Sequence, residues 1–162
     1  MNSKVKELVS NIVTENDVTL VSVYNLPNTT EAVSELFTCL AAEEINVDMI
    51  SLTPSLTTKA TVSFSAKDSD MTAVLKTIGR IKERFEDIRT DVNAENVIFT
   101  FEGERMRNIW GVSASVFTAF KQYNTQIKLI TTSETSISCL IAGSDYGKAV
   151  KMLDEVFGIK RV

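Results

Sequence analysis

Two stretches of the sequence decide the fold, because they repeat one pattern at a constant distance. The first reads NTTEAVSELFTCLAAEEINVDMI at residues 28–50, and the second reads NIWGVSASVFTAFKQYNTQIKLI at residues 108–130. Asn28 matches Asn108 at an offset of 80, and a Phe-Thr pair and the final isoleucine recur at the same offset. Self-similarity of this kind is typical of a duplicated structural unit. We therefore expect one supersecondary unit to occur twice.

The first copy has the pattern strand, helix, strand, strand, helix, strand. β-branched and alternating apolar residues predict the strands, and apolar residues at helical spacing predict the helices. Asn28 is a candidate N-cap for the first helix, with Glu31 as its capping-box partner. Pro54 marks the turn of a central hairpin. The expected elements are strands at 18–24, 47–53, 59–65 and 88–92, and helices at about 28–41 and 71–85.

The second copy repeats the order but lacks a closing strand. Its expected elements are strands at 97–101, 127–132 and 135–141, and helices at about 109–122 and 145–157. Residues 4–13 have no place in the first copy, and an open sheet edge favours aggregation. We therefore expect residues 4–13 to pair beside the second unit, so that a first unit at 16–93 is inserted into a second unit made of 3–14 plus 95–162.

These elements predict an α+β fold of two ferredoxin-like βαββαβ units, each an antiparallel sheet with its helices on one face. The composition, with 44% hydrophobic and 23% charged residues, is that of a globular protein. Cys39 and Cys139 lie in apolar periodic segments, where a free thiol usually behaves as a small buried hydrophobe.

The charge and residue content argue against several functional classes. Lys and Arg total 17 against 21 Asp and Glu, so the cationic excess of a nucleic-acid-binding protein is missing. No apolar run approaches the roughly 20 residues that span a membrane, and the beginning of the chain does not have a signal peptide's pattern, which favours the cytoplasm. Histidine is absent from the sequence. With no nucleophile and base, metal-ligand set or phosphate loop in the pattern, we expect no catalytic residue, cofactor or metal.

The βαββαβ order, the run INVDMI at 45–50 and the run ITTSE at 130–134 resemble the paired ACT domains of aspartate kinases. The segment at 103–107 that leads to Gly111 adds to the resemblance, which covers about residues 5–159. It implies the interleaved topology, because in that family a strand before the first unit completes the second. It also implies allosteric control by an amino acid, typically lysine or threonine, bound where ACT units of two chains meet.

The resemblance therefore implies a homodimer and, as a further partner, an aspartate kinase catalytic domain or subunit in lysine, threonine and methionine biosynthesis. The family's first effector loop reads Pro-Asp-x-Pro-Gly, and the matching stretch here is PNTTE at 27–31. Glu31 thus replaces a glycine, and Leu52 replaces a ligand-facing glutamine. We expect weak effector binding at this loop, or a changed ligand, because the Glu31 carboxylate could stand where the effector's carboxylate should sit.

Effector contacts are implied for residues at the matched positions of both units: Asn28, Thr29, Thr30, Glu31, Val33, Asp48, Leu52, Gln126, Ile127, Ser133 and Glu134, with a second loop at Asn108, Trp110 and Gly111. Six of them have a plainer structural interpretation. Asn28 and Asn108 could be simple caps, and Trp110 a lid on the neighbouring unit. Asp48 could face solvent, and Ser133 with Glu134 could cap a turn.

Three other functions stay open at this point. The chain could be a stand-alone ACT-pair sensor or oligomerisation module with no kinase partner. A ferredoxin-like sheet can also bind RNA, although the acidic balance disfavours this. An enzymatic function would come only through a parent aspartate kinase, which is a phosphotransferase.

Overall fold

The computed structural model describes residues 7–158. They divide into an inserted unit, Asp17–Glu95, and a split unit, formed by the residues up to Asn16 together with those from Asn96 on. Two long strands, β1 (Asn11–Pro27) and β4 (Arg89–Glu102), contribute to both units. Each was expected as two separate strands. Of the expected leading strand at 4–13, residues 4–6 lie outside the described residues, and the strand itself begins only at Asn11.

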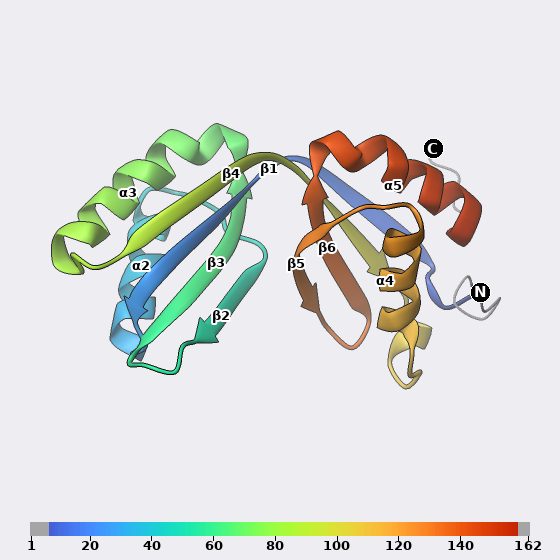
Figure 1. The fold of residues 1–162 in the computed structure, drawn as a ribbon, viewed down its shortest axis with the longest axis horizontal. Coiled ribbons are helices and arrows are strands. Elements are labelled where there is room, and N and C mark those ends of the chain that lie inside the picture. The colour runs from blue at the N-terminus through green and yellow to red at the C-terminus, as the bar shows by residue number, and fades with distance from the viewer. Residues whose placement is uncertain (1–6, 159–162) are drawn as a thin grey trace. The chain divides into compact units, whose positions relative to one another are not determined.

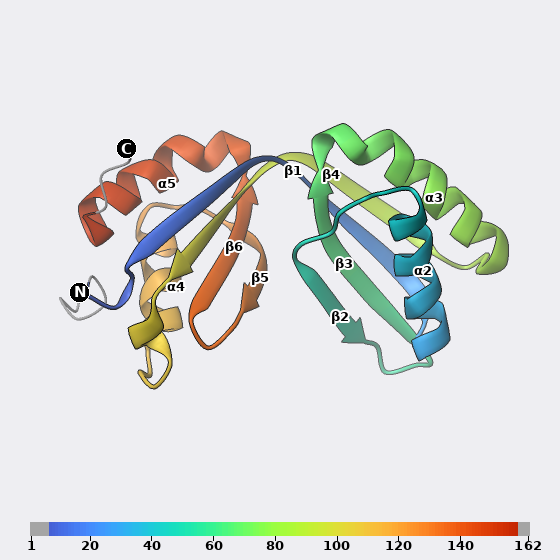
Figure 2. The same cartoon turned by 180° about the vertical axis from the view of Figure 1, so that it is seen from behind.

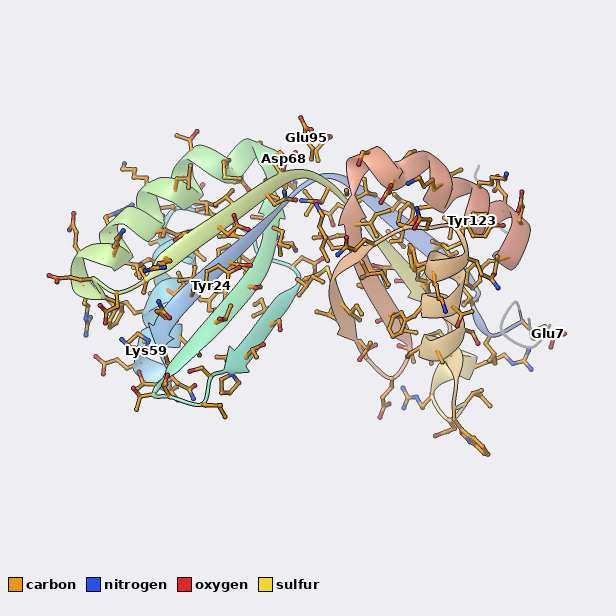
Figure 3. All side chains as sticks on the ribbon, in the orientation of Figure 1. Glu7, Tyr24, Lys59, Asp68, Glu95 and Tyr123 are labelled. Carbon is orange, nitrogen blue, oxygen red and sulfur yellow. The ribbon has the colours of Figure 1, made fainter. Side chains whose placement is uncertain are left out.

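Both strands change backbone conformation where they pass from one unit to the other. Asp17 in β1 has φ 56° and Glu95 in β4 has φ 58°, in the left-handed region that few non-glycine residues adopt. Asp68 supports this region within the inserted unit, because its carboxylate accepts the Thr19 hydroxyl at 2.5 Å and the Glu95 backbone N–H at 3.2 Å. Figure 3 labels Asp68 and Glu95.

The inserted unit is a sheet in the order β2-β3-β1-β4 with both helices on one face, in front of the sheet in Figure 2. Strand β3 runs antiparallel to β1 and to β2, and Val21 lies opposite Phe64. Its remaining elements are β2 (Ile50–Pro54), β3 (Lys59–Lys67), α2 (Thr30–Ala42), α3 (Met71–Arg84) and the 3₁₀ turn η1 (Asp68–Asp70).

The split unit repeats this arrangement in the order β1-β4-β6-β5, with its helices in front of the sheet in Figure 1. Strand β6 runs antiparallel to β4 and to β5. Its remaining elements are β5 (Ile127–Thr132), β6 (Ser136–Ala142), α4 (Val112–Gln122), α5 (Tyr146–Met152), the 3₁₀ turns η2 (Glu104–Met106) and η3 (Gly143–Asp145), and the π-helical turn η4 (Leu153–Phe157).

Each unit has its own apolar core between sheet and helices. In the inserted unit, alternate residues of the central strands face α2 and α3, and Phe64 and Leu36 are fully buried. In the split unit the Phe101 ring lies 5.1 Å from the Phe157 ring and 6.0 Å from the Phe120 ring, measured between centroids. Such packed aromatic pairs stabilise a core beyond the area they bury.

The two cysteines are free thiols, one in each unit. Cys139 is fully buried in the core of the split unit, and this burial raises the pKa of its thiol to about 12. Cys39 is half-buried and packs at the edge of the inserted unit's core.

The predicted fold class is confirmed, and the predicted order of helices and strands matches the described elements except that β1 and β4 each join two expected strands. Several boundaries were wrong. Strand β2 begins at Ile50 and not at 47. Helix α4 begins at Val112 and not near 109, because Gly111 directly before it has a left-handed backbone (φ 87°) that is not helical. The last helix was expected to continue to 157, but it widens into a π turn closed by the Gly158 N–H and the Leu153 carbonyl.

Candidate functional site

The first predicted loop precedes α2 in the inserted unit, and its cap differs from the prediction. Thr29 and not Asn28 is the N-cap, because the Thr29 hydroxyl accepts the Ala32 N–H at 3.2 Å. The Asn28 N–H instead donates to the Thr58 carbonyl at 2.8 Å, which holds this residue beside the β2–β3 hairpin. Thr30 is the first helical residue.

Glu31 does not form the predicted capping box. Its carboxylate is 2.6 Å from Arg84 on α3, and the same guanidinium is 2.5 Å from Glu35. The Arg84 guanidinium also lies over the Phe85 ring, 5.5 Å from its centroid. The Glu31 carboxylate is therefore paired with a cation of α3 while its residue stays in the first turn of α2. That it stands in place of an effector's carboxylate remains a prediction.

The other predicted residues of the inserted unit lie in α2, in β2 and in the segment that precedes β2. Val33 is partly buried against the core. Leu52 is 42% exposed on the edge strand β2, on the same face as its cross-strand partner Val62. Asp48 was expected inside a strand, but it is exposed in the segment before β2, where its backbone N–H donates to the Ser65 carbonyl at 3.2 Å.

The second predicted loop precedes α4 in the split unit and leaves the start of that helix open. Gly111 occupies the cap position, so no side chain caps the helix, and the expected cap Asn108 lies three residues earlier. The first N–H groups of a helix have no partners within the helix and can receive an anion or a carboxylate. Trp110 beside them is 96% exposed.

A cleft of about 310 Å³ at this helix start brings together four predicted residues: Trp110, Gly111, Ser133 and Glu134. Glu134 forms an ion pair with Arg107, which also lines the cleft, at 3.1 Å. Ser133 organises the β5–β6 turn, since its hydroxyl accepts the Thr135 N–H at 3.2 Å. The turn-capping interpretation of Ser133 therefore holds, and it places Glu134 beside the helix start.

The last two predicted residues, Gln126 and Ile127, lie at the opposite end of α4. They line a second, larger cleft of about 520 Å³. Tyr123, the residue that directly follows α4, is labelled in Figure 3. Two charged residues of this cleft, Lys121 and Asp145, were not predicted. Comparison at the offset of 80 could have indicated Lys121, because its counterpart in the first copy is Ala41.

The predicted residues thus form separate groups. Those at 28–52 belong to the inserted unit, and those at 108–134 belong to the split unit, where they divide between two clefts. Within residues 7–158, no group of three or more Asp, Glu or Cys side chains is placed to hold a metal ion. None of the described helices is long and apolar enough to cross a membrane.

Comparison with known proteins gives these groups a context. Residues 99–157 match the model of the ACT domain family. Aspartokinase 2 of Bacillus subtilis is 30% identical over 154 residues, which cover 95% of this chain and 38% of that protein. The chain therefore spans less than half the length of the curated relatives that it matches.

Two solved structures have the same fold over nearly the whole chain. The ligand-free regulatory subunit of aspartate kinase from Thermus thermophilus superposes with a TM-score of 0.83 at 20% identity, covering 93% of this chain and 99% of that one. Aspartate kinase from Synechocystis superposes with a TM-score of 0.85 at 26% identity, covering 96% of this chain and 28% of that one.

Proposed function

We propose that the chain is an amino-acid-binding regulatory module of aspartate kinase, because residues 99–157 match the ACT domain family and the duplicated fold is that of a regulatory subunit of aspartate kinase. The observation that carries the proposal is the position of the two clefts of the split unit, both of which lie within the ACT-domain match at 99–157. Their volumes are in the range of small-molecule sites. Both are lined by charges of either sign, which complement a free amino acid.

The start of α2 is the weaker effector site in this proposal. A helix start that receives a carboxylate needs an uncrowded first turn, and here that turn carries Glu31. Its negative charge repels an incoming carboxylate, and Arg84, the nearby cation, is already shared between Glu31 and Glu35. Effector binding at this loop is therefore weak, whereas the start of α4 carries no acidic residue in its first turn.

The proposed effector is lysine or threonine. Isothermal titration calorimetry of the purified chain with each amino acid tests this, with methionine and alanine as comparisons. Binding of lysine or threonine with a Kd in the micromolar range is expected, and alanine should bind more weakly because it lacks a side chain to fill the site. If none of the four amino acids produced heat at millimolar concentration, the proposal would be wrong.

The module is proposed to act as a homodimer. The edge strands carry partly exposed apolar side chains, Ile50 and Leu52 on β2 and Ile130 on β5, and Ile50 and Ile130 are counterparts in the repeat. An unpaired edge of this kind is a template for association. Sedimentation velocity at micromolar protein should give a dimer, and Leu52→Lys should give a monomer. Leu56→Lys, at a fully exposed hairpin position, is the control that should stay dimeric.

The proposed partner is an aspartate kinase catalytic domain or subunit in the cytoplasm. The alternative is a stand-alone sensor with no kinase partner, which the altered first loop with its Glu31–Arg84 ion pair favours. Affinity purification of the tagged chain from its own cells separates the two functions. Recovery of a kinase supports the first, and recovery of the tagged chain with only copies of itself supports the second.

A further inference from the structure

The cleft at the end of α4 combines an apolar wall with polar groups that point to a particular ligand. Its volume of about 520 Å³ exceeds that of the cleft at the helix start. Phe117 and Ile127 supply the apolar surface. The polar lining comes from Lys121, Asn124, Thr125, Gln126 and Asp145. Sites that hold small molecules are typically mostly apolar with a few placed polar groups, and this cleft has both.

Asp145 is the acidic residue of the cleft, and only some of the hydrogen-bond acceptor positions of its carboxylate are occupied. Its side chain is 18% exposed, and one carboxylate oxygen accepts Lys148 Nζ at 2.7 Å. That ammonium group also lies 3.5 Å from the Asn124 carbonyl. The second carboxylate oxygen of Asp145 has no hydrogen-bond partner within the described part of the chain. A carboxylate has about four acceptor positions, so Asp145 can accept further donors.

Lys121 supplies a positive charge to the same cleft. It lies in the last turn of α4, and its ammonium forms no ion pair with any residue between 7 and 158. Lys121 and Asp145 thus present opposite charges in the lining of one cleft, and these complement the two charged groups of a zwitterion.

The first copy of the repeat provides an internal comparison. At the offset of 80, Lys121 corresponds to Ala41, Thr125 to Ile45 and Asn124 to Glu44. The corresponding end of α2 therefore lacks the cation and carries an added negative charge. The polar residues that line this cleft therefore occur only in the split unit, although both units share the same fold.

We propose that this cleft binds the charged head of a free α-amino acid, with Asp145 accepting its ammonium group and Lys121 contacting its carboxylate. The side chain of the ligand then lies against Phe117 and Ile127. This inference rests on the proposed function and assigns a location and two specificity-determining side chains to it.

Calorimetric titration of three variants with lysine and threonine tests the assignment. Asp145→Asn and Lys121→Gln should each weaken binding about tenfold or more, because each removes a charge-assisted interaction with the ligand. Lys151→Gln is the matched control on α5, since its ammonium is 3.8 Å from Glu155 and does not line the cleft. It should bind as the wild type does.

Amide chemical shifts of the wild-type chain during the titration give a readout that does not depend on the variants. The largest changes are expected at 121–127 and 143–148. If the wild type binds but the Asp145 and Lys121 variants bind equally well, or if the shifts concentrate at 28–31, the cleft assignment is overturned while the proposed function stands. If the wild type binds no amino acid, the proposed function fails and the assignment with it.

Discussion

Arg84 Nη2 lies 2.6 Å from Glu31 Oε1, so the last turn of α3 is tied to the first turn of α2 across 53 positions of sequence. Both side chains are more than half exposed, so the pair adds little to stability. The ion pair matters more for ligand binding. Arg84 lies beside the start of α2, but its charge is already paired with the chain's own Glu31 carboxylate.

Glu31→Gly should strengthen amino-acid binding at the first loop about fivefold, since it removes a repelling carboxylate and leaves Arg84 with a single partner, Glu35. Calorimetric titration with lysine and threonine measures the change. Ser34→Gly, an exposed substitution in the same helix, controls for the effect of glycine on helix stability. Equal affinities in wild type and Glu31→Gly would mean that the first loop takes no part in binding.

Gly103→Ala should destabilise the chain, because an added Cβ would lie 1.9 Å from the Leu8 carbonyl oxygen. A loss of about 1–3 kcal/mol in the free energy of unfolding is expected from such overpacking. Urea denaturation followed by circular dichroism measures it. Gly79→Ala is the matched control, since this position in α3 has nothing within 4 Å, and a gain of about 0.5–1 kcal/mol is expected there. A neutral Gly103→Ala would contradict the close approach of the two segments.

Thr77→Val should stabilise the inserted unit. The Thr77 side chain is fully buried in α3, and its hydroxyl has no hydrogen-bond partner among the described residues. Replacing a buried, unpaired hydroxyl by a methyl group of the same shape removes a desolvation cost of about 1–3 kcal/mol. Thermal denaturation should show a raised Tm. A lowered Tm would indicate that the hydroxyl is bonded in solution, for example to a buried water.

The two thiols should react at very different rates with a thiol reagent. Cys39 is half-buried and should react in the folded chain, whereas Cys139 should react only when the split unit unfolds. Burial raises the pKa of the Cys139 thiol to about 12, so the folded chain loses stability as the pH rises from about 9, where the unfolded thiol ionises. Labelling of a Cys39→Ser variant isolates Cys139. Rapid labelling of that variant at neutral pH would contradict its burial.

The elements of the fold were predictable because their signals are local. Strand alternation such as Val62 and Phe64, and the helical spacing of Ile78 and Ile81, depend only on neighbouring residues. The continuity of β1 was not predictable, since the polar run around Asp17 resembles a break. The strand continues there with Asp17 in a left-handed backbone conformation, and the local sequence pattern does not predict this conformation.

The site was less predictable because its contacts join residues that are distant in sequence. Asn28 and Thr29 are both good caps, and only the pairing of Asn28 with Thr58 leaves the capping role to Thr29. The Arg84 partner of Glu31 likewise depends on the packing of α2 against α3. Gly111 at the start of α4, and Glu134 in the same cleft, could be predicted because the family resemblance includes both positions.

The sharing of β1 and β4 between the two units has a consequence for biosynthesis. Residues 11–16 emerge from the ribosome before the inserted unit, yet their partners in β4 follow only after the whole inserted unit has been made. The inserted unit can fold during translation, while the leading strand must wait with its edge exposed. A truncation anywhere between 17 and 95 therefore damages both halves of the protein, and neither half can be released by a single cut.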